Sequence, residues 1–408
     1  MLIGYKPVWV MRVAIVSEVF MPAVDGVVTR LQHTLEELQR AGDDVVMIAP
    51  AGGPDSYAGF PVIGVREISM PLYPDGDGYP PKRVALPGPA LSRALERHRP
   101  DVVHTINPVL LGAGAVAIAR RRGWPVVASY HAHLPTYAHL YRCGWLEPAV
   151  WRYIRVLHNL AELNLCTSRA TLETLRQHGI ERLELWPYGI ETERFHPSKA
   201  DDRWRWRLSG GRPERVILLF VGRLAKEKTV ERLLEAVAGR DDVALAIVGD
   251  GPLRSRLEGT FAGTPTTFLG FLHGEELASA YASADVFVFP SETETLGLVT
   301  LEAQASGLPV IAADSPAARE LVAHGVNGLR YSPATAGALR DAVRVLVREP
   351  ELRRRMARAG RASVGTAGWR HATDTLRSWY GAVSRPAQRG LTQVAASADG
   401  YAERRDIA

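Results

Sequence analysis

Ser291-Glu292-Thr293-Glu294-Thr295-Leu296-Gly297-Leu298-Val299-Thr300-Leu301-Glu302 is the most informative segment of this chain. The apolar run before it, 285–290, predicts a buried parallel strand, and the run after Gly297 predicts a helix. A strand, a short loop and a helix N-terminus leave backbone N–H groups unpaired, and such groups bind anions. Glu294 and Glu302 can accept hydrogen bonds from sugar hydroxyls while the amides of 295–298 hold a diphosphate. The pattern favours a nucleotide-sugar, and a solvated helix face is the alternative for this segment alone.

Apolar runs of four to six residues alternate with longer helical patterns over most of the chain. Because the runs are continuous, they predict strands buried on both faces, and hence parallel sheets covered by helices. The expected strands are 13–16, 45–49, 102–104, 126–129, 163–167, 216–221, 244–248, 266–269, 286–289 and 310–313. The expected helices of the first half are 27–41, 110–122, 145–161 and 168–178. This order predicts an α/β fold with two doubly wound, Rossmann-like parallel-sheet domains.

Both the length of the chain and one break in the alternation of strands and helices predict more than one domain. A chain of 408 residues exceeds what one core usually supports. Residues 186–202 carry turn residues without any period, and we expect a linker there. The predicted parts are the domain 11–185, the linker 186–202, the domain 203–368, a helix over 369–385 and a disordered tail over 386–408. Ligands are expected in the cleft between the carboxyl ends of the two sets of strands.

Composition excludes several classes of protein. Hydrophobic residues make up 46% of the chain and charged residues 23%, which is ordinary for a globular protein. Arg340–Arg361 holds eight arginines against three acids, so this region alone matches the net charge of +5. No aromatic residues interleave with it, so we expect no nucleic acid partner, and either a solvated helix face or an anionic membrane surface explains it. Cys143 and Cys166 form no disulfide framework, and no apolar run could span a membrane, so a cytoplasmic location is expected.

The loop that follows the first strand of the second domain holds two cations. Arg223 and Lys228 lie at the carboxyl end of strand 216–221, where they could neutralise a diphosphate leaving group. An exposed basic loop is the alternative. The Gly-rich turn that begins at Gly249 ends the next strand, and either a tight turn or a nucleotide contact explains it.

The first loop of the first domain is expected to line the opposite side of the cleft from Arg223 and Lys228. Gly26 opens the helix after strand 13–16 and would let the backbone approach a phosphate. Asp25, directly before it, is either the N-cap of that helix or a catalytic carboxylate.

Two patterns resemble metal sites, and both are better explained otherwise. His131 and His133 form an H-x-H pair after strand 126–129, but no third ligand is evident. Asp75 and Asp77 lie in a Pro/Gly-rich loop without a preceding strand, which indicates a turn.

These motifs together resemble those of glycosyltransferase family 4, whose members are retaining enzymes with the two-domain GT-B fold. Glu294 and Glu302 match its E-x7-E element, and Arg223 and Lys228 match its G-R-L…E-K pattern. The resemblance covers about residues 12–383. It implies a nucleotide-sugar donor, no metal or other cofactor, and a last helix that crosses back onto the first domain.

The resemblance also implies a role for each matching residue. Arg223 and Lys228 would grip the donor phosphates, Glu302 would hydrogen-bond the ribose, and His131 would face the transferred sugar. The implied donor-binding residues are Gly26, Arg223, Lys228, Gly249, Leu272, Glu294, Thr295, Leu296, Gly297, Leu298 and Glu302. The implied catalytic residues are His131, Arg223, Lys228 and Glu294, and the implied acceptor-binding residues are Tyr130, His133 and Tyr137.

The family's favoured mechanism is front-face substitution, in which the departing phosphate accepts the proton of the acceptor. Arg223, Lys228 and the amides at Gly297 would stabilise the negative charge that grows on that phosphate. His131 and Glu294 would position the sugar without performing acid–base chemistry. Domain closure would exclude water from the donor.

The donor and the acceptor are the least specified parts. The stretches that look most like sulfoquinovosyltransferases of sulfolipid synthesis are 129–137, 280–288 and 290–301. They imply UDP-sulfoquinovose as donor and diacylglycerol as acceptor. Residues 11–26 and 304–308 look as much like GDP-mannose-dependent α-mannosyltransferases of bacterial glycolipid synthesis. Those enzymes usually carry an aromatic residue where this chain has Leu296, which favours a UDP-sugar.

Several alternatives stay open. The acceptor is either a membrane lipid or a small molecule. Trp145, Trp151, Arg152 and Arg155 suit a helix that faces a membrane, which predicts a peripheral location on its inner face. A phosphorylase, a non-hydrolysing epimerase and a non-catalytic sugar-binding module could share the fold.

Overall fold

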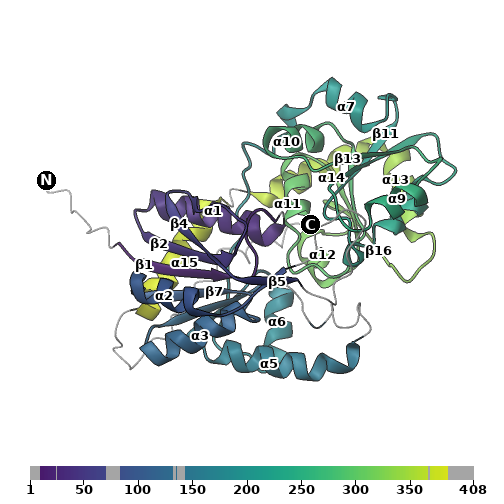
Figure 1. The fold of residues 1–408 in the computed structure, drawn as a ribbon. Helices are drawn as coiled ribbons and strands as arrows, with labels where there is room; N and C mark the ends of the chain where they lie inside the picture. The colour runs from purple at the N-terminus through teal and green to yellow at the C-terminus, as the bar shows by residue number, and fades with distance from the viewer. Residues whose placement is uncertain are drawn as a thin grey trace, which may run out of the picture.

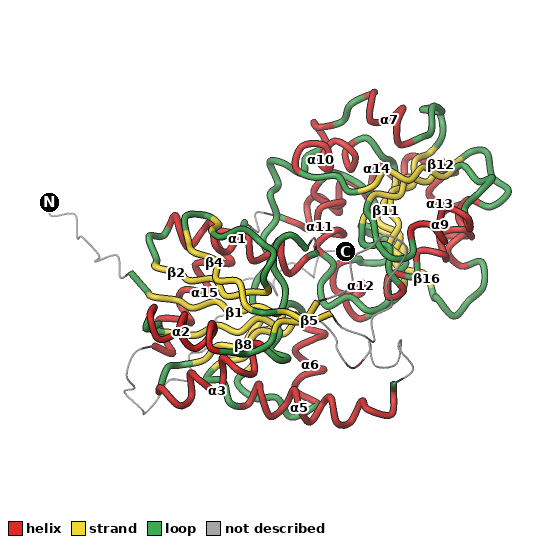
Figure 2. The backbone as a smooth tube through the Cα atoms, viewed as in Figure 1, coloured by secondary structure: helices red, strands yellow, loops and turns green. Residues whose placement is uncertain are grey.

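The computed structural model describes residues 10–384, apart from 24, 70–82, 132–134, 136–142 and 366–367. The described residues form two α/β domains, each with a mostly parallel sheet between helices (Figure 1). Figure 2 shows the two groups of strands in yellow, flanked by helices in red. The predicted pair of doubly wound parallel-sheet domains is confirmed.

The first sheet has the strand order β10-β9-β8-β7-β1-β2-β4-β3. Its strands are β1 (Arg12–Ser17), β2 (Asp44–Pro50), β3 (Ser56–Tyr57), β4 (Phe60–Val65), β7 (Val102–Ile106), β8 (Val126–Tyr130), β9 (Leu163–Cys166) and β10 (Leu183–Leu185). The helices that cover it are α1 (Gly26–Arg40), α2 (Pro89–His98), α3 (Leu111–Arg122), α5 (Glu147–Asn159) and α6 (Arg169–Gln177). A separate antiparallel ribbon joins β5 (Glu67–Ser69) to β6 (Arg83–Ala85).

The second sheet has the order β13-β12-β11-β14-β15-β16 and is parallel throughout. Its strands are β11 (Val216–Val221), β12 (Val243–Val248), β13 (Thr266–Gly270), β14 (Val286–Phe289), β15 (Val310–Ala313) and β16 (Gly328–Tyr331). Its helices are α7 (Asp202–Leu208), α8 (Leu234–Val237), α9 (Arg254–Thr260), α10 (Gly274–Ala282), α11 (Leu298–Ala305), α12 (Pro316–Leu321), α13 (Ala338–Arg348) and α14 (Pro350–Val364).

The order of strands places a topological switch point in each sheet. In the second sheet the chain runs outward from β11 through β12 to β13, and then returns to the other side of β11 with β14. In the first sheet the corresponding switch lies between β1 and β7. Loops diverge at such points and leave room for a ligand at the carboxyl ends of the strands.

The buried strands are those that the sequence marks most clearly. In β12 every residue is buried, and β11 pairs with it in register from Val216↔Val243 to Val221↔Val248. Val, Ile and Leu fill both faces of these strands, because helices cover both faces of the sheet. The strand β4 was not predicted, since Pro61 and Gly64 interrupt its apolar pattern, and it forms an antiparallel edge with β3.

The helix α15 (Trp369–Ser384) follows the second domain in sequence but packs beside α1 of the first domain (Figure 1). Arg377 donates to both carboxylate oxygens of Asp43, at 2.6 and 3.1 Å. Gly189, in the segment between the domains, touches Trp369 so closely that a Cβ there would lie 2.5 Å from the Cα of Trp369. The tail expected over 386–408 lies outside the described residues. None of the helices described is both long enough and apolar enough to cross a bilayer.

Candidate active site

The two loops at the switch point of the second sheet are tied together by ion pairs and hydrogen bonds. Lys228, in the loop after β11, forms an ion pair with Glu294, in the loop after β14. Arg223 forms an ion pair with the buried Glu227. The carbonyl oxygen of Glu227 accepts hydrogen bonds from Ser291 Oγ at 3.2 Å and from a threonine of the same loop at 3.3 Å. The structure therefore brings Arg223, Lys228 and Glu294 to one edge of the sheet.

Glu227 has a structural part in this site that the sequence interpretation did not assign. Glu227 lies in a short 3-10 turn over Lys226–Lys228, and Arg223 lies in the loop before that turn. The contact therefore depends on the path of the loop and not on helical spacing.

The N-terminus of α11 is open. Gly297 precedes it in the left-handed conformation, with φ of 87° and ψ of 61°, which a glycine adopts without strain. Within the described part of the chain, no side chain caps this helix. The first N–H groups of such a helix attract anions.

Glu302 lies on the same helix and faces a tyrosine of α10. The hydroxyl of Tyr281 donates to Glu302 Oε2 at 2.9 Å. Burial raises the pKa of Glu302 to about 7, although the hydrogen bond from Tyr281 opposes this shift. Tyr281 is fully buried, and no local pattern in the sequence indicated this contact.

The glycine turn after β12 packs against the loop after β11. Gly249 has φ of 128°, and a Cβ there would lie 2.0 Å from the carbonyl oxygen of Gly222. Its N–H donates to the carbonyl of Gly270 at 2.7 Å. The tight-turn explanation of Gly249 therefore has direct geometric support. Leu272, after β13, is buried, and Phe271 beside it is exposed.

The first domain meets this region through the N-terminus of α1. Asp25 Oδ1 accepts hydrogen bonds from the N–H groups of Val27 and Val28, both at 2.9 Å, so the N-cap alternative describes what Asp25 does here. A Cβ on Gly26 would lie 3.6 Å from Leu298 Cδ1 at the start of α11. A methyl group at position 26 would thus reach van der Waals contact with the opposite wall.

His131 lies at the same junction. Thr295 Oγ1 donates to its carbonyl oxygen at 2.9 Å, and its ring Nε2 lies 2.9 Å from Ser129 Oγ. Burial, together with the charge of the nearby Arg30, holds the pKa of His131 well below its ordinary value, so the ring is neutral at pH 7. This neutrality fits a residue that positions a ligand.

Of the three predicted acceptor-binding residues, the structure describes only Tyr130, and this residue is buried. Tyr130 is 1% exposed and packs with Trp151 and Ile154 beneath α5, so its ring offers no surface to an acceptor. Its side chain points inward because it ends a buried strand. His133 and Tyr137 lie outside the described residues, as do Asp75 and Asp77. Among the residues that are described, no three His, Cys, Asp or Glu side chains gather as metal ligands would.

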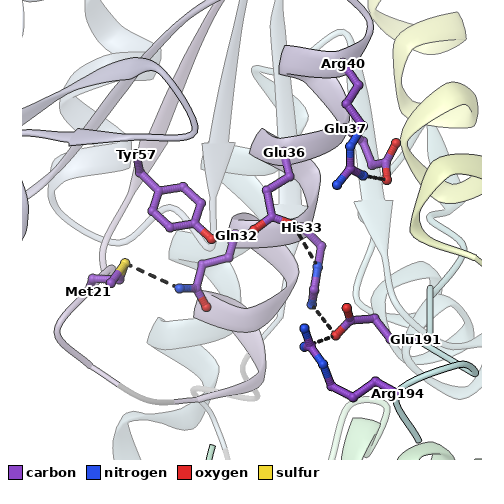
Figure 3. Close-up of polar contacts among 9 residues, drawn as sticks. All are labelled: Met21, Gln32, His33, Glu36, Glu37, Arg40, Tyr57, Glu191 and Arg194. Carbon is purple, nitrogen blue, oxygen red and sulfur yellow. Dashed lines mark hydrogen bonds and ion pairs between the residues drawn. The ribbon is translucent and has the colours of Figure 1, made fainter. Parts of the chain in front are cut away.

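A polar cluster borders the site on the side of the interdomain segment (Figure 3). His33 of α1 lies 3.3 Å from Glu36 through Nδ1 and 3.4 Å from Glu191 through Nε2. Glu191 also forms an ion pair with Arg194. The charges of Glu191, His33 and Arg194 act on the pKa of Glu302, which places this cluster close to the α11 carboxylate.

Comparisons with known proteins agree with this architecture. Residues 24–194 match the family described as Glycosyltransferase Family 4, and residues 202–363 match Glycosyl transferases group 1. The sulfoquinovosyl transferase SQD2 of Arabidopsis thaliana is 36% identical over 87% of this chain and 70% of that protein. A GDP-mannose-dependent alpha-mannosyltransferase of Mycobacterium tuberculosis is 41% identical over 91% of this chain and 97% of that protein.

Solved structures share the fold at lower identity. Sucrose-phosphate synthase from Thermosynechococcus elongatus is similar with a TM-score of 0.74 and 23% identity, covering 91% of this chain and 98% of that one. HepE of Anabaena in complex with UDP is similar with a TM-score of 0.73 and 18% identity, covering 91% of this chain and 100% of that one.

Proposed function

Because the chain belongs to glycosyltransferase family 4, we propose that it is a retaining, metal-independent hexosyltransferase that moves a sugar from a nucleoside diphosphate to a hydroxyl group. The observation that carries this proposal is the meeting of Arg223, Lys228 and the uncapped N-terminus of α11 at one switch point. Two cations and a helix N-terminus stabilise a departing diphosphate where its negative charge develops.

The reaction breaks the bond between the anomeric carbon and the diphosphate oxygen and forms a bond from that carbon to the acceptor oxygen. The acceptor's proton goes to the departing phosphate oxygen on the same face of the sugar. Lys228 leaves Glu294 for the phosphate, and Glu294 then accepts hydrogen bonds from the sugar hydroxyls. Glu302 accepts from the ribose, and His131 positions the sugar as a neutral ring.

The donor has two candidates, each with its own support. Leu296, in place of an aromatic residue, favours a UDP-sugar, with UDP-sulfoquinovose as the specific candidate. The 41% identity to a GDP-mannose-dependent enzyme over 91% of this chain favours GDP-mannose. In either case we propose that backbone groups near Leu272 hold the base.

We propose a membrane lipid such as diacylglycerol as acceptor, because the outward face of α5 suits contact with an anionic bilayer. Trp145, directly before this helix, is 79% exposed, and Val156 is 53% exposed. Arg152 and Arg155 are exposed on the same helix. Apolar side chains beside cations on an exposed helix are typical of peripheral binding to anionic lipid.

The proposal is tested first by ligand stabilisation of the native protein. UDP-, GDP- and ADP-sugars are compared by thermal shift, because a ligand that binds only the folded state raises the melting temperature. Release of the nucleoside diphosphate over time, dependent on a lipid acceptor, is then measured with the stabilising donor. A response to GDP-mannose without a response to UDP-sugars would overturn the UDP assignment, and no response to any nucleotide-sugar would overturn the function.

A further inference from the structure

A buried chain of hydrogen bonds runs from the C-terminal helix α15 to His131. The hydroxyl of Tyr380 lies 2.6 Å from His104 Nδ1, and His104 Nε2 lies 3.0 Å from Ser129 Oγ. Ser129 Oγ lies 2.9 Å from His131 Nε2. Tyr380, His104 and Ser129 are completely buried, and His131 is 8% exposed. The residues come from α15, β7, β8 and the segment directly after β8, which leads into the site.

The direction of each hydrogen bond follows from the number of hydrogens available. The hydroxyl of Tyr380 carries one hydrogen, and in the described part of the chain its hydrogen-bond partner is His104. A buried hydroxyl hydrogen needs an acceptor, so Tyr380 donates to Nδ1, and the proton of a neutral His104 is on Nε2. His104 therefore donates to Ser129, and the hydrogen of Ser129 is left for Nε2 of His131. A neutral His131 then carries its own proton on Nδ1.

Burial and the charge of a nearby arginine together keep both imidazoles neutral, so the hydrogen bonds between these four residues run in one direction only. Arg30 is 2% exposed, and its guanidinium carbon lies 4.5 Å from the ring centre of Trp186. It donates to the carbonyl of Pro187 at 3.1 Å, while its Nη2 has no hydrogen-bond partner among the described residues. Burial, with the charge of Arg30, lowers the pKa of His104 to about 3. A proton on either ring would reverse the chain, and the nearby positive charge opposes such a proton.

We propose that Tyr380 is a positioning residue that fixes His131, through His104 and Ser129, as a neutral ring donating a hydrogen bond from Nδ1 to the transferred sugar. This inference deepens the proposed function and rests on it for the identity of the sugar. Nδ1 has no partner among the described residues, so it is available to a ligand oxygen. Because Nε2 accepts a hydrogen bond from Ser129, His131 acts toward the sugar as a hydrogen-bond donor through Nδ1. It therefore takes no proton from the hydroxyl substrate, and that proton goes to the departing phosphate.

The experiment reads the tautomer directly, so it does not depend on activity. Protein labelled with ¹⁵N-histidine is studied by long-range ¹H–¹⁵N correlation at pH 7.5, and His131 is assigned with a His131→Gln variant. We expect a protonated Nδ1 and an unprotonated Nε2 in the wild type. Tyr380→Phe keeps the ring packed on His104 but removes the hydrogen that orders the chain, so both tautomers of His131 should appear.

Ser129→Ala interrupts the series of hydrogen bonds at a second point. It tests the same inference if Tyr380→Phe does not fold. Tyr57→Phe is the matched control, since it removes a tyrosine hydrogen bond of 2.7 Å to Glu36 elsewhere in the same domain. We expect it to leave His131 unchanged. In turnover assays Tyr380→Phe should lower kcat/KM by about threefold to tenfold, the worth of one neutral hydrogen bond.

Two results would overturn the inference. One is a wild-type His131 protonated on Nε2. The other is a His131 whose tautomer is the same in the wild type, Tyr380→Phe and Ser129→Ala. Failure of the proposed glycosyltransferase activity would appear separately, as a lack of nucleotide release by a protein whose tautomers behave as described.

Discussion

The pH dependence of donor binding should report the ionisation of Glu302. Its carboxyl has a pKa of about 7, since burial disfavours the charged form. Only the carboxylate can accept hydrogen bonds from both ribose hydroxyls. Tyr281→Phe removes a hydrogen bond of 2.9 Å that stabilises this carboxylate, while the ring keeps its contacts with Phe195 and Phe287. We therefore expect the variant to bind the donor over a narrower, more alkaline range.

The size of the effect follows from the strength of the lost bond. A hydrogen bond to a charged group contributes about 1.5–3 kcal/mol, and one pKa unit corresponds to about 1.4 kcal/mol. The pKa of Glu302 should therefore rise by about one to two units in Tyr281→Phe. In the wild type the apparent affinity for the donor should fall about tenfold per pH unit below pH 6, because the proton must leave before the donor binds. In the variant the same decline should begin one to two units higher, at about pH 7 to 8.

The assay is calorimetric or fluorescence titration of the stabilising nucleotide-sugar from pH 5.5 to 9. Tyr331→Phe serves as control, because it removes the hydroxyl of another buried tyrosine of the same domain. The decisive quantity is the midpoint of the plot of donor affinity against pH. A general loss of stability would lower the affinity at every pH but would leave this midpoint unchanged. A wild-type affinity that is flat across this range, or a midpoint that is unchanged in Tyr281→Phe, would refute the role given to Glu302.

Four further outcomes are expected. Lys228→Ala should lower kcat/KM by about 10²–10³, because it removes a cation aimed at the leaving group, and steady-state kinetics at donor saturation and below measure this. Gly249→Ala should lower the free energy of unfolding by about 3 kcal/mol, because its Cβ would lie 2.0 Å from a carbonyl oxygen. The control Gly239→Ala, which has open space around it, should lower it by about 1 kcal/mol, and urea unfolding measures both. Burial lowers the pKa of His158 from 6.5 to about 4, so the unfolded chain binds a proton that the folded chain lacks, and stability falls as pH falls through this range; His158→Gln should reduce that slope by about 1.4 kcal/mol per pH unit. Arg155→Glu should weaken binding to vesicles with anionic lipid by about tenfold and leave binding to neutral vesicles unchanged.

The sequence was sufficient for the parts of the fold that depend on local pattern. The bounds of β11 and β14 agree with the predicted strands, because continuous apolar runs between polar punctuation are typical of strands buried on both faces. The loops that follow these strands were identified for the same reason. Since neighbouring parallel strands end at one edge of a sheet, Lys228 and Glu294 could be expected to approach each other, and they form an ion pair.

The parts that escaped prediction depend on contacts between distant segments. Tyr281 and Glu302 are 21 residues apart, and Tyr380 and His104 are 276 apart, so no periodicity links either pair. Tyr130 was expected at the acceptor pocket because the loop after it resembles one. A strand's last side chain points to one face or the other, and here the face is the one that α5 covers.

The ion pairs of Arg223 and Lys228 bear on how a donor would be selected under the proposed mechanism. Each of these cations faces a carboxylate, so neither charge is buried without a partner. A free phosphate that took Lys228 would leave Glu294 without its cation, and an unpaired, half-buried charge is costly. A nucleotide-sugar avoids that cost, because its phosphates replace Glu294 at Lys228 and its sugar hydroxyls replace Lys228 at Glu294. Both residues regain a partner only when the ligand carries phosphates and sugar hydroxyls at the right separation. The proposed mechanism therefore uses Lys228 and Glu294 to select the donor, and Lys228 also stabilises the leaving group.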